Sequence, residues 1–210
     1  RNILISDEQG LGDTIQFSRF VIELLKFTKK ITFVVNSKLT KLLSNLNKNI
    51  IVMEYKDLKT DSFDYHLSLC SLPLFLKIKD INDINYYPLD FKIKNNVSFK
   101  KNIVNIGLSS SGNPNFPQDE YRSFSFKKFK NFLNIKRINF FKLSQNVRDQ
   151  DFLDCHSFSN FFDFGDKSIF QISEVMKELD LVISSDTSII HLAGILNIKS
   201  ILLLNYNSDW

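Results

Sequence analysis

The feature that most constrains the fold of this sequence is a regular alternation between short apolar runs and amphipathic stretches. In the first part of the chain, apolar runs at residues 1–6, 31–35 and 50–54 alternate with stretches of helical periodicity at 14–27 and 39–46. Parallel strands need a crossover connection, and a crossover helix covers a face that the strands must bury. This order therefore predicts an α/β fold with a parallel sheet.

A second alternation follows the first, which predicts two α/β halves. The first series closes with a strand at residues 63–69, which we expect Ser71, Leu72 and Pro73 to end, because proline cannot donate to a strand ladder. The second series comprises expected strands at 103–108, 138–143, 180–184 and 200–204, and expected helices near 126–133, 168–179 and 188–196.

The connection between the halves is predicted in the polar segment 77–101, which is rich in Asn, Asp and Lys. We place the boundary near Asn96, giving an N-terminal Rossmann-like domain at 1–96 and a C-terminal domain at 97–210. A chain of 210 residues is long enough for two small domains. Because the sequence opens at Arg1 inside a strand-like run, we expect it to be a fragment.

Composition excludes several classes of protein. Hydrophobic residues make up 43% and charged residues 24%, which excludes a disordered tail, a collagen-like fibre and a disulfide-stapled mini-protein. The net charge is +4, but the lysines are scattered, so nucleic acid is not an expected partner. Cys70 and Cys155 form no CxxC pair, which signals neither a zinc site nor a disulfide framework and fits a reduced cytoplasmic setting. The longest apolar stretch, around 67–76, is too short for the roughly 20 residues of a membrane span.

The first motif that could carry chemistry is Gly10-Leu11-Gly12-Asp13, between the first expected strand and its helix. Open α/β sheets bind ligands at such turns, where glycines let the backbone approach a ligand and free helix amides face it. Ile15 stands where a dinucleotide fingerprint would have its third glycine, which argues against a Rossmann dehydrogenase. Asp13 is interpreted either as a ligand-facing carboxylate or as the N-cap of the helix.

The second motif is the run 184–188 (SSDTS), again at an expected strand-to-helix turn. Its hydroxyls, with exposed helix amides behind them, would suit a pyrophosphate. His191 lies one turn into the helix, on the same side as Thr187. The alternative is a capping cluster of Asp186, Thr187 and Ser188 with a satisfied histidine on the helix face.

The third motif, Ser111-Gly112-Asn113, also follows an expected strand end, and Arg122 lies shortly after it. An arginine beside such a loop can make forked hydrogen bonds to phosphate oxygens. The alternative for Arg122 is a surface ion pair with Asp119 or Glu120. A fourth candidate, His66, is placed at a strand end, where it could hydrogen-bond a sugar or an acceptor or be purely structural.

Five motifs occur in one order along the chain: EQGLGDTIQFSRF at 8–20, FDYHLSLCSLP at 63–73, GLSSSGNP with DEYRS at 107–123, LDLVISSDTSIIHLAG at 179–194, and DW at 209–210. Together they resemble the glycosyltransferase domain often found behind tetratricopeptide repeats in bacterial proteins. That domain is related to the family 9 heptosyltransferases and, more distantly, to O-linked N-acetylglucosamine transferases. Single motifs such as GLGD are weak, but five in the right order with compatible spacing are specific.

The resemblance implies a GT-B fold, with two Rossmann-like halves facing a cleft, and an inverting transfer of a sugar from a nucleotide sugar without a metal or other cofactor. It implies Asp13 as the general base that removes the proton of the acceptor hydroxyl. Donor pyrophosphate is then expected at Asp186, Thr187, Ser188 and His191, where a helix N-terminus stabilises the leaving diphosphate. The other implied donor-side residues are Gly10, Gly12, Ser111, Gly112, Asn113 and Arg122, and His66 is assigned to the acceptor side.

The same resemblance sets expectations for partners. The acceptor is expected to be a glycan, a lipid-linked molecule or a protein, tetratricopeptide repeats are expected upstream, and the location is expected to be cytoplasmic, with room for peripheral contact at the inner face of the membrane. Relatives carry a Trp-containing WAGNP-like loop where this chain has 110–114, and commonly a glycine where Ser188 stands. They also continue past the DW dipeptide, so the C-terminal half is expected to be incomplete.

Two other functions are considered beside the transferase. One is a catalytically degenerate module that still binds a nucleotide or a glycan, motivated by the substituted Trp loop. The other is a GT-B-type epimerase, which would need its own acid and base pair, and the sequence shows no such pair.

Overall fold

The computed structural model describes residues 2–59, 63–93, 99, 102–115, 117, 119–144 and 155–205. The chain forms two compact units, the first at Arg1–Lys92 and the second at Ile93–Trp210. The boundary predicted near Asn96 lies outside the described residues, as does the closing DW dipeptide.

The first unit is built on a four-stranded sheet in the order β3-β2-β1-β4, with every pairing parallel. The strands are β1 (Ile3–Ser6), β2 (Ile31–Val34), β3 (Ile50–Met53) and β4 (Tyr65–Ser68). β-branched residues are frequent in β1, β2 and β3, which favours extended backbone. β2 is buried along its whole length, as expected for a parallel strand between two neighbours.

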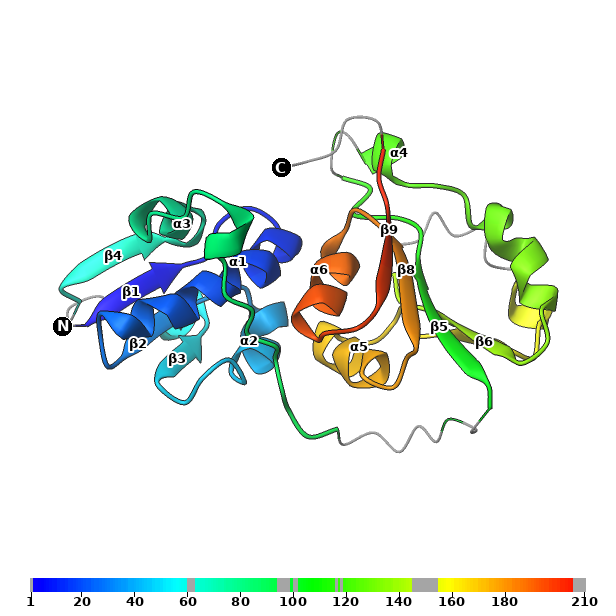
Figure 1. Ribbon diagram of the computed structural model, residues 1–210, viewed down its shortest axis with the longest axis horizontal. Coiled ribbons are helices and arrows are strands. Elements are labelled where there is room, and N and C mark those ends of the chain that lie inside the picture. The colour runs from blue at the N-terminus through cyan, green and yellow to red at the C-terminus, as the bar shows by residue number, and fades with distance from the viewer. Residues whose placement is uncertain are drawn as a thin grey trace. The chain divides into compact units, whose positions relative to one another are not determined.

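Helices connect these strands and supply the apolar layer against the sheet (Figure 1). They are α1 (Leu11–Glu23), η1 (Leu24–Lys26), α2 (Ser37–Leu43), η2 (Tyr55–Asp57), η4 (Leu69–Ser71), α3 (Leu72–Phe75) and η5 (Ile81–Asp83). α1 begins three residues earlier than the apolar periodicity predicts. The expectation that Pro73 ends a strand is wrong, because β4 already ends at Ser68 and Pro73 lies in the first turn of α3, where its missing N–H costs nothing.

The second unit contains a five-stranded parallel sheet in the order β7-β6-β5-β8-β9. Its strands are β5 (Val104–Ser109), β6 (Ile138–Lys142), β7 (Phe161–Asp163), β8 (Leu181–Ser185) and β9 (Ser200–Leu203). Its helices are α4 (Asp119–Arg122), η6 (Phe126–Asn134), η8 (Cys155–Ser157), α5 (Ile169–Met176) and α6 (Ser188–Ile195). The two predicted Rossmann-like halves with parallel sheets are thus confirmed.

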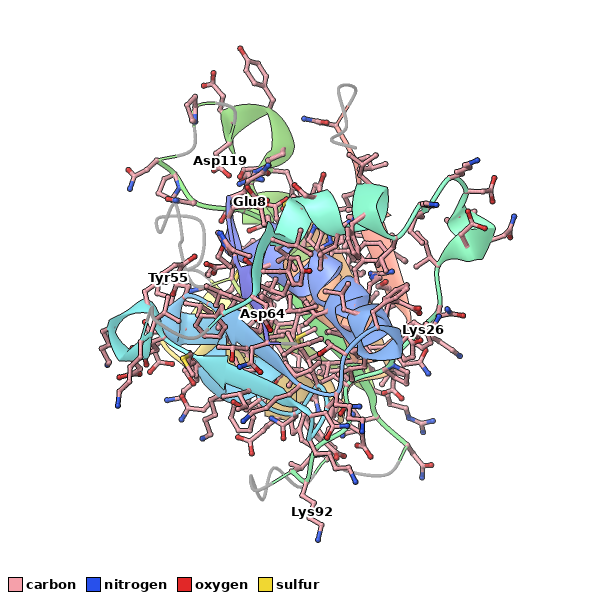
Figure 2. The ribbon with its side chains drawn as sticks, turned by 90° about the vertical axis from the view of Figure 1, so that its left-hand side faces the viewer. Glu8, Lys26, Tyr55, Asp64, Lys92 and Asp119 are labelled. Carbon is pink, nitrogen blue, oxygen red and sulfur yellow. The ribbon has the colours of Figure 1, made fainter. Side chains whose placement is uncertain are left out.

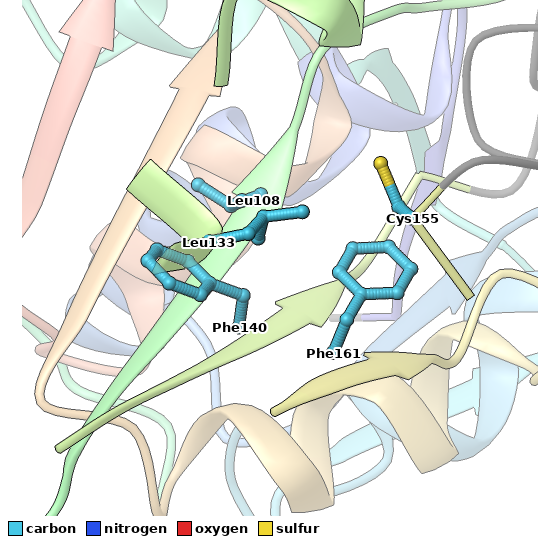
Figure 3. Close-up of a cluster of buried hydrophobic side chains, with 5 residues drawn as sticks. All are labelled: Leu108, Leu133, Phe140, Cys155 and Phe161. Carbon is cyan, nitrogen blue, oxygen red and sulfur yellow. The ribbon is translucent and has the colours of Figure 1, made fainter. Parts of the chain in front are cut away.

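A cluster of buried side chains covers one face of the second sheet (Figure 3). Leu108 and Phe140 come from neighbouring strands, Phe161 from β7, and Leu133 and Cys155 from the 3-10 turns above them. On the opposite face of β5, Gly107 leaves room for the Leu143 side chain, because a Cβ there would lie 2.6 Å from a methyl carbon of Leu143. Packing therefore explains this glycine without reference to a ligand.

The two sheets share one topology, in which the second and third strands lie on one side of the first strand and the fourth lies on the other. Successive strands are added on one side of the first strand and then on its other side, so the order of strands reverses between β1 and β4 in the first unit and between β5 and β8 in the second. Loops leaving the carboxyl ends of strands on either side of such a reversal splay apart, and open α/β sheets bind ligands there.

Candidate functional site

The motifs singled out in the sequence lie at these two topological switch points. The turn with Gly10 and Asp13 follows β1, the loop with Gly112 follows β5, and the turn with Thr187 follows β8. Each unit is described by itself below.

The loop after β1 is anchored at its first residue, Asp7. The Tyr55 hydroxyl donates to Asp7 Oδ1 (2.6 Å) and to the Asp7 carbonyl oxygen (2.8 Å). The Asn36 amide donates to Asp7 Oδ2 (2.8 Å), and the Asp7 amide donates to the Val34 carbonyl (2.9 Å). Asp7 therefore ties the β1 loop to the loops that follow β2 and β3.

The next two residues continue this restraint. The Cys70 amide, which follows β4, donates to Glu8 Oε1 (2.9 Å). Gln9 has φ 62°, in the left-handed region that non-glycine residues rarely adopt. Backbone strain of this kind persists only where neighbouring contacts hold it, and it is concentrated at functional sites.

Asp13 lies at the start of α1, where its carboxylate turns back toward the loop. The Gly10 amide donates to Asp13 Oδ2 (2.9 Å), and Gly10, not Asp13, is the N-cap. A Cβ on Gly10 would lie 3.0 Å from that oxygen, so the glycine makes room for the carboxylate. Asp13 is half-buried, and Gly12 belongs to the first turn of the same helix.

Acidic groups gather at this edge of the sheet. Burial, together with the nearby Glu8 and Asp13 carboxylates, raises the pKa of the Cys70 thiol to about 11, so the thiol stays protonated. Burial and the Asp7 carboxylate likewise raise the pKa of Tyr55, which remains a hydrogen-bond donor. Figure 2 labels Glu8 and Tyr55 on this unit.

His66 lies on β4, the strand that pairs with β1. It is an exposed residue within β4, and its Nε2 lies 2.8 Å from the Ser6 hydroxyl oxygen. That contact orients the ring on the edge strand of the first sheet, one strand away from the Asp13 turn.

In the second unit, hydroxyl groups cluster below the start of α6. Thr187 Oγ1 lies 3.3 Å from the Ser184 hydroxyl and 3.5 Å from the Ser109 hydroxyl, and these side chains are buried. The neighbouring Ser185 is fully buried, and its hydroxyl has no hydrogen-bond partner among the residues that the structure describes. A buried polar group without a partner is costly, and a bound ligand, an ion or an ordered water would supply the missing hydrogen bond.

The helix start above these hydroxyls differs from its neighbour. Thr187 is the N-cap of α6 but makes no capping hydrogen bond through its side chain. In α5, by contrast, Ser168 Oγ accepts from the Gln171 amide (3.3 Å) and Gln171 Oε1 accepts from the Ser168 amide (3.0 Å). Side chains therefore cap the start of α5, whereas no side chain caps the start of α6.

Asp186 and His191 flank the same helix start. Their Oδ1 and Nε2 atoms lie 3.8 Å apart, and each side chain is about three-quarters buried. The Asp186 carboxylate therefore lies beside the His191 ring at the start of α6.

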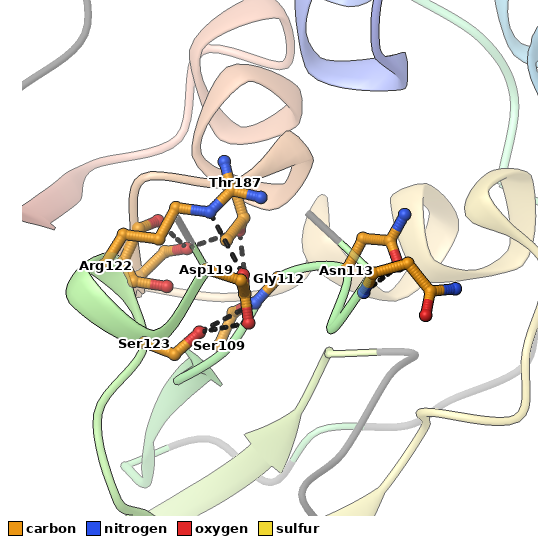
Figure 4. Close-up of polar contacts among 10 residues, drawn as sticks. Ser109, Gly112, Asn113, Asp119, Arg122, Ser123 and Thr187 are labelled. Carbon is orange, nitrogen blue, oxygen red and sulfur yellow. Dashed lines mark hydrogen bonds and ion pairs between the residues drawn. The ribbon is translucent and has the colours of Figure 1, made fainter. Parts of the chain in front are cut away.

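The loop after β5 is held by α4 (Figure 4). Asp119 is buried, and it accepts from Arg122 Nε (3.1 Å) and from the Ser123 hydroxyl (2.9 Å). That hydroxyl in turn accepts from the Gly112 amide (3.3 Å). A Cβ on Gly112 would lie 2.6 Å from both Asp119 Oδ1 and Arg122 Nη2.

This network bears on three of the predicted site residues. Arg122 pairs with Asp119, which agrees with the interpretation of this arginine as a member of an ion pair. Ser111 is buried and Asn113 is exposed. The Asn113 side-chain oxygen accepts from the Asn115 amide (3.1 Å), which closes a local turn.

Sequence reasoning missed the groups that hold these loops. Asp7 and Tyr55 act through contacts between residues far apart in sequence, and no local pattern marks them. The sequence offers Asp119 as an ion-pair partner of Arg122, but it does not predict that this carboxylate is buried. Sequence reasoning also missed a partly buried ion pair at the ends of β6 and β7, where the buried Lys142 places its Nζ 2.9 Å from Oδ2 of the exposed Asp163. A lysine that ends an apolar strand is the one signal that could have found that pair.

Neither a metal cluster nor a membrane-spanning helix is present among the described residues. They contain no group of three or more His, Cys, Asp or Glu side chains that could hold a metal ion. None of their helices is both long enough and apolar enough to cross a membrane.

Comparison with known proteins gives a clear result for the fold. No protein-family model matches the sequence, and no curated protein matches it. Among solved structures, E. coli heptosyltransferase WaaC with ADP matches 100% of this chain and 89% of its own, with a TM-score of 0.67 and 10% identity. A family 9 glycosyl transferase from Veillonella parvula matches 99% and 82%, with a TM-score of 0.71 and 13% identity.

A third similar solved structure is described as containing iron. The heptosyltransferase TibC, described as dodecameric and iron-containing, in complex with ADP-D-β-D-heptose, matches 97% of this chain and 58% of its own. Its TM-score is 0.71 at 12% identity. The fold is that of the heptosyltransferases. At these identities the likeness establishes the fold alone.

Proposed function

We propose that this chain is a glycosyltransferase domain that transfers a sugar from a nucleotide sugar to an acceptor hydroxyl with inversion. The observation that carries the proposal is the open N-terminus of α6, which stands over buried hydroxyls at the switch point of the second sheet. Among solved structures of this fold, WaaC is in complex with ADP and TibC with ADP-D-β-D-heptose. Asp13, at the switch point of the first sheet, supplies the carboxylate.

The donor site is assigned to the first turn of α6. An uncapped helix N-terminus carries unsatisfied amides and roughly half a positive charge, which suits a diphosphate. Thr187 and Ser188 contribute hydroxyls and amides there, and His191 adds a donor beside Asp186. Charge on the departing nucleotide is stabilised by these groups, and we propose that no metal ion is needed.

Asp13 acts as the general base in this proposal. The acceptor oxygen attacks the anomeric carbon while the bond from that carbon to the phosphate oxygen breaks. The proton of the acceptor hydroxyl passes to the Asp13 carboxylate, and the electron pair leaves with the nucleotide. The contact from the Gly10 amide keeps the carboxylate oriented, and half-burial limits the water around it.

The test uses the full chain and the nucleotide sugar that raises its melting temperature most among ADP-, UDP-, GDP- and CMP-sugars. Asp13→Asn is expected to lower kcat for nucleotide release by about a hundredfold or more, because a positioned base contributes on that scale. Asp83→Asn is a matched control, since Asp83 accepts an amide hydrogen bond at the start of η5 as Asp13 does at α1. Full turnover in the Asp13 variant would refute the assignment.

A binding module without catalysis is the second candidate. The observation in its favour is the ion pair between Arg122 and Asp119. This pair engages the guanidinium that a phosphate site could otherwise use. Calorimetry that shows donor binding, with no nucleotide released under any acceptor, would favour this candidate over the transferase. The acceptor class, upstream repeats and cytoplasmic location stay predictions.

A further inference from the structure

A pocket lies on one face of the first sheet, under the connection from β3 to β4. α1 and α2 connect β1, β2 and β3 in one direction across the sheet, and right-handed crossovers of that kind place both helices on the same face. The connection at residues 54–64 runs in the opposite direction, so the same rule places it on the other face. Among its described residues the only helix is the three-residue η2, where such crossovers usually carry an α-helix.

The alternation of side chains along β2 and β3 shows that this second face is incompletely covered. Successive residues of a strand point to opposite faces, and Ile31 and Phe33 are fully buried on one of them. Thr32, Ile51 and Met53 face the other way and line the pocket, and Thr32 lies beside Ile51 in the strand register. A parallel sheet ordinarily buries both faces, but Ile51 is 37% exposed.

The pocket has the size and lining of a small-molecule site. Its volume is about 340 Å³, at the lower end of the range for such sites. Ile51 and Met53 supply apolar surface from the sheet, and Phe63 supplies it from the connection. Ligand pockets typically combine apolar walls with a small number of polar groups that orient the ligand.

Thr32 is a polar group of this kind. Its side chain is 8% exposed, and its hydroxyl makes no side-chain hydrogen bond with any residue that the structure describes. Buried hydroxyls are nearly always hydrogen-bonded in folded proteins. A ligand or an ordered water in the pocket would supply the partner that Thr32 lacks.

The charged groups of the lining carry a net positive charge. Lys30 and Lys59 both line the pocket, and neither forms an ion pair with a carboxylate in the described part of the chain. The acidic residue of the lining is Asp57, which lies near the exposed Lys56. Two ammonium groups against one carboxylate favour an anion.

We propose that this pocket binds a small amphipathic organic anion. Its apolar body would lie against Ile51, Met53 and Phe63, which releases water from the open sheet face. Its anionic group would pair with Lys30 and Lys59. A neutral ligand would leave both ammonium groups without a partner, so the charge selects an anion.

The pocket is separate from the candidate catalytic edge. Lys30 precedes β2, and Thr32 lies in the first half of that strand, whereas Asp13 follows the carboxyl end of β1. The inference therefore goes beyond the proposed function and stands independently of it.

The experiment is a fluorescence titration of the full chain with two probes. One is 8-anilinonaphthalene-1-sulfonate, and the other is N-phenyl-1-naphthylamine, which has the same rings without the sulfonate. We expect the sulfonate probe to bind at one site about tenfold more tightly than the neutral probe, because two exposed ion pairs together contribute on that scale. Decanoate, an aliphatic anion, is expected to displace it. Lys30→Gln with Lys59→Gln is expected to remove the preference for the sulfonate and leave the affinity for the neutral probe unchanged.

The apolar surface and the hydroxyl are tested separately. Ile51→Glu is expected to abolish binding of the sulfonate probe, because it places a carboxylate in the pocket. Its matched control is Ile201→Glu, at an exposed isoleucine of β9, which should leave binding unchanged. Thr32→Val keeps the shape of the side chain and is expected to weaken binding about fivefold through the lost hydrogen bond.

Equal melting temperatures show that each variant is folded. Equal affinity for the two probes, failure of decanoate to displace the sulfonate probe, unaltered binding in the Ile51, Thr32 or double-lysine variant, or equal loss in the Ile201 control would each overturn the proposal.

Discussion

At the scale of single residues, the loop after β1 is held at three of the four positions between the strand and the helix. Asp7, Glu8 and Gly10 each take part in a hydrogen bond outside their own backbone pattern, and the remaining residue, Gln9, has a left-handed backbone. A loop restrained in this way has lost its conformational freedom before any ligand arrives. That preorganisation is what a positioned carboxylate needs.

Tyr55→Phe tests this restraint. The variant removes the donor to Asp7 Oδ1 and to the Asp7 carbonyl oxygen, and it is expected to lower the free energy of unfolding by about 1 kcal/mol, the typical net contribution of a hydrogen bond. Urea denaturation measures the change. Tyr121→Phe, an exposed tyrosine of the second unit, is the control and should change stability by less than about 0.5 kcal/mol. Equal stability of the two variants would show that the Tyr55 hydroxyl does not stabilise the loop after β1.

The sequence identified the residues at this turn better than it identified their partners. Gly10 and Asp13 stand in a recognisable pattern between a strand and a helix, so their place at a switch point could be predicted. The partner of Asp7 is Tyr55, 48 positions away, and only the packed sheet brings the two together. Likewise, nothing local predicts that Asp119 is buried below the β5 loop.

At the scale of elements, the strands and helices with a full apolar pattern were predicted, and the short ones were not. β7 has three residues and α3 has four, which is too few for any periodicity to register. Residues 126–134 carry a helical pattern but form a 3-10 helix, η6. The pattern specifies which face is apolar, whereas the choice between α and 3-10 geometry depends on packing.

Glu23 gives a pH test at the scale of elements, since it joins α1 to the segment that follows η5. Burial opposes its ionisation, but hydrogen bonds from Lys26, Tyr87 and Asn85 outweigh burial, so its pKa is lowered from 4.5. A carboxyl with a lowered pKa contributes stability above its unfolded pKa and loses it as the pH falls through its folded pKa. Glu23→Gln should therefore destabilise the first unit at pH 7 and converge with the parent chain below about pH 4. A stability difference that grows on acidification would contradict this assignment.

At the scale of the whole molecule, two sheets of the same topology each place a candidate motif at the switch point. The first contributes a carboxylate, and the second contributes a helix start with buried hydroxyls below it. The likeness to heptosyltransferases spans nearly the whole chain at 10–13% identity, which shows that the fold is shared where the sequence is not. Function is then decided by the side chains at the two switch points.

The central claim is that α6, and not α5, receives the nucleotide. Hydrogen exchange of the full chain, read by mass spectrometry with and without the nucleoside diphosphate among ADP, UDP and GDP that stabilises it most, tests this most directly. Amides in the first turn of a helix exchange readily unless a ligand accepts from them. The account predicts slower exchange at residues 187–189, before the amide of Ile190, which already donates to the Thr187 carbonyl, and no change at 168–171. Protection at the start of α5, or at neither helix, would contradict it.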